Sequence, residues 1–168
     1  MQFLTAKTVL YLRVAGLTFI AFLLLKNPVK VANANITVLL GQAMNLPIVQ
    51  ATPGNPLFGI LAVFVASSVL GDLIPIFAEN IAYFETLVPT RLLFFFVLGS
   101  FCLISDYGLI ANNLVFSYSF LEIWLNFLVY NNLRDEKYYR AKEYLEQHGE
   151  ELREMADAQV MPITDLDR

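Results

Sequence analysis

Long apolar runs, separated by polar or proline-containing connections, set the pattern of this 168-residue chain. Four runs stand out: Thr8–Leu25, Leu57–Ala78, Val88–Ser105 and Leu114–Tyr130. Each is long enough for an α-helix that crosses the hydrocarbon core of a bilayer, which takes roughly 20 residues. None alternates polar with apolar positions as the strands of a membrane β-barrel do. The pattern predicts an all-α fold, a bundle of four transmembrane helices within residues 1–133.

The connections predict how the four spans are joined. Glu79–Leu87 and Asp106–Asn113 are short, so the second, third and fourth spans should be antiparallel neighbours. The longer connection between the first two spans contains Asn35–Pro47, which is too short to cross a membrane. We expect a short interfacial helix there, between spans one and two, with Asn35 as its N-cap and its end before the proline.

The chain turns polar after the fourth run. Glu136 and Arg140, like Lys142 and Glu146, are oppositely charged pairs four residues apart, a spacing that supports a helix. We therefore expect the fourth helix to extend into the cytosol to about residue 147, before Gly149, as part of a polar segment and acidic tail over residues 134–168.

Composition favours a membrane protein. The chain is 57% hydrophobic and only 15% charged, with a mean hydropathy of +0.58, whereas soluble domains are about one quarter charged. A net charge of −4 without a basic block argues against nucleic acid as a partner. The single cysteine, Cys102, allows no intrachain disulfide, and the single histidine, His148, lies in the polar tail. No metal-ligand cluster is visible, and no cofactor is expected.

Lysines and arginines near the span ends predict the orientation, because they concentrate on the cytosolic side. The side that carries both termini has six: Lys7, Arg91, Arg134, Lys137, Arg140 and Lys142. The other side has two, Lys26 and Lys30. Both termini should therefore be cytosolic. Asn35 opens an Asn-Ile-Thr sequon on the opposite side, where glycosylation is possible, although such triplets are also common by chance.

Four charged residues fall inside the predicted spans. In this topology they share one layer in the cytosolic half of the membrane: Arg13, Asp72, Arg91 and Glu122. An unpaired charge at mid-membrane costs about 2.5–3.5 kcal/mol on insertion scales, and such residues usually face the bundle and pair. Two acids and two bases at similar depth predict an intramembrane ion-pair layer. The sequence leaves open whether Asp72 pairs with Arg13 or with Arg91, Glu122 taking the other arginine.

Smaller polar residues accompany the two acids. Ser68 is four residues before Asp72, and Ser119 and Asn126 flank Glu122 at helical spacing, so we expect them to support the layer. The first interpretation of the layer is structural, namely that it fixes the arrangement of the helices. The alternative is a polar path for an ion or a lipid headgroup, since buried charges in membranes often mark such paths.

Catalytic interpretations of Asp72 fit poorly. An aspartyl protease needs a second carboxylate that shares a proton, and the other aspartate near a span, Asp106, is predicted at the opposite membrane face. A serine hydrolase needs a histidine near the nucleophile, and none lies near Ser67 or Ser68. We therefore do not expect an enzyme, and we assign no catalytic or cofactor-binding residue.

Five short motifs occur in an order that resembles one fungal family. They are LKN at 25–27, QAMNLP at 42–47, DLIP at 72–75, VPTRLLFFF at 88–96 and EIWLNFLVYN at 122–131. The family is the one named for increased loss of mitochondrial DNA. This resemblance implies a small multi-pass protein of the endoplasmic reticulum membrane, needed for mitochondrial genome maintenance and without an agreed enzymatic activity. A mitochondrial membrane is the alternative location, but residues 1–7 make a poor transit peptide because they contain one lysine and no arginine.

The combined expectation is a non-enzymatic accessory or scaffold subunit of a larger endoplasmic reticulum membrane complex, whose partners are lipids and other membrane proteins. The aromatic residues Phe94, Phe95 and Phe96 suit contact with a partner helix, and they suit contact with lipid equally well. The alternative function is a carrier or channel component for ions or lipids that uses the charged layer.

Overall fold

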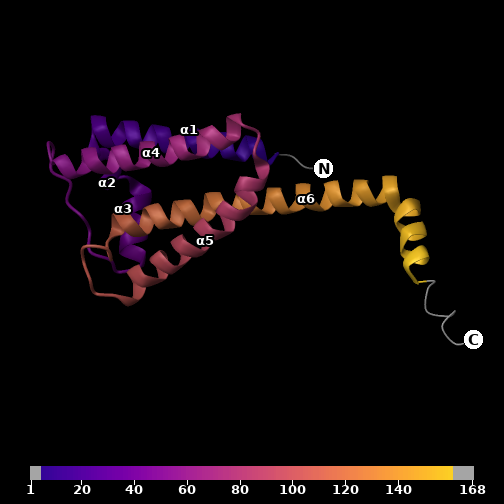
Figure 1. The fold of residues 1–168 in the computed structure, drawn as a ribbon. Coiled ribbons are helices and arrows are strands. Elements are labelled where there is room, and N and C mark those ends of the chain that lie inside the picture. The colour runs from indigo at the N-terminus through magenta and orange to yellow at the C-terminus, as the bar shows by residue number, and fades with distance from the viewer. Residues whose placement is uncertain (1–4, 161–168) are drawn as a thin grey trace, which may run out of the picture. The chain divides into compact units, whose positions relative to one another are not determined.

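The structure, a computed structural model, describes residues 5–160, and within that range every regular element is a helix (Figure 1). The helices are α1 (Ala6–Lys26), α2 (Pro28–Ala32), α3 (Asn35–Ala43), α4 (Pro56–Phe77), α5 (Ile81–Ile104) and α6 (Asn113–Val160). The expected all-α class is therefore confirmed. The chain divides into two compact units, Met1–Asn132 and Leu133–Arg168.

Three of the described helices, α1, α4 and α5, are long and apolar enough to cross a membrane. The first part of α6, where the fourth span is predicted, is not among them. Glu122 and Asn126 lie in this part of α6 and lower its hydropathy, although both side chains are buried. The fourth span therefore stays a prediction.

Asparagine and threonine side chains begin the three apolar helices. Thr5 Oγ1 accepts a hydrogen bond from the backbone N–H of Thr8, and Asn55 and Asn80 do the same at the starts of α4 and α5. Such caps satisfy backbone donors that have no partner inside the helix. The Asn80 cap starts α5 at Ile81, earlier than the predicted Val88, and this leaves Pro89 inside the helix.

The region between α1 and α4 differs from the prediction at one helix start. Asn35 is the first residue of α3 rather than its cap, because Ala34 occupies the cap position and makes no side-chain hydrogen bond there. An additional short helix, α2, precedes it and is capped by the Asn27 side chain. As predicted, α3 ends before Pro47.

The expected end of the last helix was wrong. α6 continues through Gly149 to Val160 instead of ending near residue 147. A glycine inside a helix costs only about 1 kcal/mol relative to alanine. Residues 150–154, Glu-Glu-Leu-Arg-Glu, are all good helix formers and compensate for it.

The core of the first unit forms mainly where α1 lies against α4 (Figure 1). Apolar residues of both helices form one buried cluster: Leu17, Ala21, Leu24, Phe58, Ala62, Val65 and Val69. Small residues allow α6 to approach two other helices. A Cβ atom added to Gly99 of α5 would lie 3.7 Å from Ile123 of α6, and one added to Gly41 of α3 would lie only 2.6 Å from the Cβ of Asn113.

Candidate functional site: a buried charge cluster

Four helices of the first unit each contribute one charged residue to a single site. Arg13 comes from α1, Asp72 from α4, Arg91 from α5 and Glu122 from α6. We refer to these four residues as the charge cluster. The side chains of Arg13, Asp72 and Glu122 are at most 3% exposed, whereas that of Arg91 is 22% exposed. The structure thus brings together all four charged residues that the sequence places in one layer.

The cluster is a chain of alternating charges. Arg91 Nη1 donates to Asp72 Oδ1 at 2.6 Å, and the other oxygen of Asp72 forms an ion pair with Nη1 of Arg13. Arg13 Nη2 donates to both oxygens of Glu122, at 3.0 and 2.8 Å. Asp72 is therefore shared by both arginines, and Glu122 pairs with Arg13. The sequence left the pairing open and did not anticipate a shared aspartate.

Two neutral side chains complete the surroundings of Glu122. The Tyr118 hydroxyl donates to Oε1 at 2.9 Å, and Asn126 Nδ2 donates to Oε2 at 2.9 Å. Sequence reasoning selected Asn126 but missed Tyr118. The signal was present, because Tyr118 precedes Glu122 by four residues, the spacing at which helix neighbours meet. The ring of Phe95 packs edge-on against Tyr118, with 5.7 Å between ring centroids.

The two serines expected to support the acids bond elsewhere. Ser68 donates to the carbonyl of Phe64 at 3.2 Å, and Ser119 donates to that of Val115 at 2.8 Å. Each bond satisfies the hydroxyl within its own helix, a common arrangement for serine in membrane helices. Neither hydrogen bond reaches a carboxylate. Asn35 is exposed on α3 and is not part of the charge cluster.

The arrangement neutralises charge. Two guanidinium groups face two carboxylates, so the cluster has no formal net charge, and the paired geometry suits groups removed from water. Within residues 5–160, no three His, Cys, Asp or Glu side chains are grouped as a metal site would require. The geometry can hold four helices in one register, because moving any of them breaks at least one charged contact.

Three apolar helices long enough to span a membrane, joined to a fourth helix by a neutralised polar core, define an α-helical membrane protein. Residues 4–143 match the model of the family described as increased loss of mitochondrial DNA protein 1, and the chain belongs to this family. It is also 39% identical over 137 residues to Protein ILM1 of Saccharomyces cerevisiae, which covers 81% of this chain and 68% of the yeast protein. No solved structure gives a significant match.

Proposed function

We propose that this protein is a non-enzymatic accessory or scaffold subunit of a larger complex in the endoplasmic reticulum membrane. The observation that carries the proposal is the charge cluster, in which every charged group faces an opposite charge of the same chain. A carboxylate used for chemistry or transport needs a proton, an ion or a substrate in exchange. Here both carboxylates already accept hydrogen bonds from arginine, which suits a structural role.

The proposal includes four spans with both termini in the cytosol, the fourth being the first part of α6. Arg13 and Asn126 both donate hydrogen bonds to Glu122, so a span that contains this acid would carry it paired and hydrogen-bonded. The opposite face of the same helix segment is apolar, with Trp124 and Phe127 more than half exposed. A helix with a polar inner face and an aromatic outer face suits a bundle in lipid.

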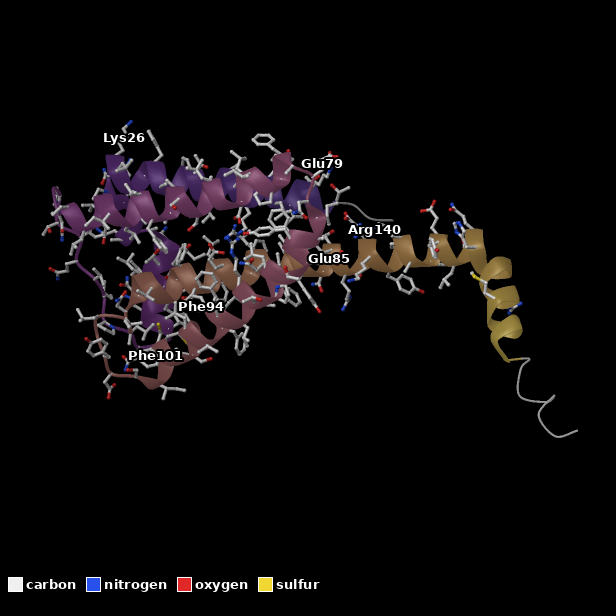
Figure 2. The ribbon with its side chains drawn as sticks, viewed as in Figure 1. Lys26, Glu79, Glu85, Phe94, Phe101 and Arg140 are labelled. Carbon is white, nitrogen blue, oxygen red and sulfur yellow. The ribbon has the colours of Figure 1, made fainter. Side chains whose placement is uncertain are left out.

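Apolar side chains on α5 supply the proposed contact surface for a partner. Leu93, Phe94, Phe96 and Val97 are each about 60% exposed or more, and Figure 2 shows Phe94 with Phe101 farther along the same helix. Both lipid and a partner helix could cover this surface. We favour a partner helix, because a non-enzymatic protein acts through the proteins that it binds.

The proposed link to mitochondria is indirect. The description of the matching family refers to loss of mitochondrial DNA. An endoplasmic reticulum complex that supplies lipids or ions would affect mitochondrial genome maintenance without entering mitochondria. A mitochondrial membrane location is the alternative, and localisation of the tagged protein in intact cells distinguishes the two.

The test of the subunit role is purification of the full chain in mild detergent, followed by mass spectrometry of stoichiometric partners. We expect a membrane protein partner whose recovery falls at least fivefold with Phe94→Ala and Phe96→Ala combined. A matched control is Ile60→Ala with Phe64→Ala on α4, two residues of similar exposure. Recovery of monomers alone, or equal loss in both pairs, would contradict the proposal.

A carrier of lipids is the second candidate, and one observation favours it over an ion channel. The first unit contains a cavity of about 610 Å³ lined almost entirely by apolar side chains, which suits a lipid better than a hydrated ion. A carrier that uses Asp72 predicts that Asp72→Asn remains abundant but inactive. Flux of lipid or ions in reconstituted liposomes measures this activity directly.

A further inference from the structure

The cavity of the first unit forms a groove between helices. Its wall includes Leu24 of α1, Leu61 of α4 and Leu40 of α3, together with Leu114, Leu121 and Trp124 of α6. We refer to it as the α1–α6 groove. The charge cluster does not use this space, although Tyr118 joins the two, because its ring lines the groove and its hydroxyl bonds to Glu122.

One end of the groove lies where three helices have their ends. α1 ends at Lys26, α4 begins at Pro56 and α6 begins at Asn113, and the groove extends inward from there. Along α6 it covers Leu114 to Trp124, about 15 Å at a rise of 1.5 Å per residue. The hydrocarbon core of a bilayer is about 30 Å thick, so the groove is about as deep as one leaflet.

A lysine belongs to this groove, which is otherwise almost entirely apolar. Lys30 of α2 contributes to the wall, and its side chain is exposed. The ion pairs found among the described residues do not include Lys30. A cation beside an apolar groove one leaflet deep complements an anionic lipid, whose net negative headgroup is held at the surface while an acyl chain extends below it.

We propose that the α1–α6 groove binds one acyl chain of an anionic phospholipid, whose net negative headgroup pairs with Lys30. Water fits the groove poorly because its lining offers few hydrogen-bond partners. A partner helix is about 10–12 Å wide, and a concave space walled by α1, α2, α3, α4 and α6 suits a single flexible chain better. The inference rests on the proposed membrane arrangement but not on the subunit role.

The test uses the full chain in phosphatidylcholine vesicles that contain a photoreactive phospholipid with its diazirine in the acyl chain. The probe carries either a phosphatidylserine or a phosphatidylcholine headgroup on identical chains. We expect cross-links to map to α6 within 114–124 and to the end of α1, and the serine lipid to be preferred. Cross-links spread evenly over α4 and α5 would overturn the proposal.

Two pairs of variants separate chain binding from headgroup binding. Leu40→Trp fills the groove, so we expect cross-linking within it to fall at least fivefold. Leu39→Trp is its control, because the preceding residue is exposed and lies outside the groove, and it should leave the cross-linking unchanged. Lys30→Gln should reduce the preference for the serine headgroup about fivefold, as expected for one surface cation at an anionic membrane. Lys26→Gln is its control, because Lys26 lies outside the groove, over the Phe22 ring.

Each result supports or overturns a distinct statement. Equal cross-linking of Leu40→Trp and the unchanged chain overturns the groove as the site. An unchanged headgroup preference in Lys30→Gln overturns the contact between Lys30 and the anionic headgroup. A photoreactive amino acid at Leu121 that captures a protein in place of lipid also overturns the inference. Extraction of the protein from membranes by alkaline carbonate contradicts the proposed membrane arrangement instead, so the two failures are distinguishable.

Discussion

The charge cluster and the α1–α6 groove lie in the same unit and share Tyr118, yet their chemistry is opposite. In the cluster, four charged side chains occupy the space between helices and satisfy one another. In the groove, apolar side chains leave about 610 Å³ unfilled. Ionic contacts have short, directional geometry, so the cluster fixes helix positions. An apolar wall has no such requirement, so the groove can accommodate a ligand.

This difference assigns stability to one region and binding to the other. Substitutions in the cluster should reduce folding and abundance, because they leave buried charges without partners. Substitutions of groove residues outside the buried apolar core, such as Leu40, should change ligand contacts with little effect on folding. Reduced abundance of a variant at such a groove residue, or unchanged abundance of a charge-cluster variant, would contradict the division.

The largest expected effect is that of Arg13→Met. Arg13 is the only residue of the charge cluster that pairs with both acids, so its loss leaves Glu122 without an arginine and Asp72 with Arg91 alone. Removing one partner of a buried ion pair costs about 3–5 kcal/mol. We expect strongly reduced membrane abundance and a lower midpoint of thermal unfolding in detergent. Abundance equal to that of the unchanged chain would contradict the structural role of the cluster.

The second-largest expected effect distinguishes the two arginine partners of Asp72, Arg13 and Arg91. Asp72→Leu removes the acceptor of both arginines, but Arg13 keeps Glu122 and Arg91 is partly exposed, so we expect a loss of about 3 kcal/mol. Adding Arg91→Met should restore most of this loss, because the Arg13–Glu122 pair then remains complete with Tyr118 and Asn126.

The matched control combines Asp72→Leu with Arg13→Met. This double variant leaves Glu122 buried without an arginine, so it should recover nothing. Membrane abundance and complementation of a strain that lacks the protein are measured for all the variants. Equal recovery of abundance in the two double variants, or recovery in neither, would contradict the chain of contacts that the structure shows.

A smaller effect is expected where α3 meets the start of α6. Gly41→Ala places a Cβ 2.6 Å from that of Asn113, and such overpacking typically costs about 1–3 kcal/mol. Gly59→Ala in α4 is the control, because nothing lies within 4 Å of its added Cβ, and alanine there should stabilise the helix by about 0.5–1 kcal/mol. Thermal unfolding of both variants in the same detergent measures the contrast. Equal midpoints would mean that α3 can move away from α6.

The sequence predicted most of the helices, because long apolar runs and their caps act locally. It also predicted which four charged residues lie together, because the predicted span boundaries place them at similar positions along their helices. It could not predict the pairing, since depth says nothing of the direction in which each helix faces. The groove was not predicted either. Its wall combines residues from five helices, and a cavity depends on how those helices pack rather than on any one segment.

The smallest expected effect comes from an exposed ion pair between the first turn of α1 and the turn that joins α4 to α5. Lys7 Nζ lies 2.8 Å from Glu79 Oε1, in the turn between α4 and α5, and both side chains are exposed. Figure 2 shows Glu79 at the end of the α1–α4 pair opposite to Lys26. The hydrogen bond and charge of Lys7 lower the pKa of Glu79 from its ordinary 4.5. Exposed ion pairs are screened by water and salt and contribute little to stability.

A lowered pKa in the folded state means that the stabilisation is present above pH 4.5 and is lost as the pH falls through the folded-state pKa. Glu79→Gln should therefore lower the unfolding midpoint only slightly at pH 7, and the difference from the unchanged chain should vanish at low pH and in concentrated salt. The comparison with Arg13→Met is direct, because each variant removes one charged partner of an ion pair, exposed in the case of Glu79 and buried in the case of Arg13. A loss from Glu79→Gln as large as that from Arg13→Met would mean that burial does not control the strength of these pairs.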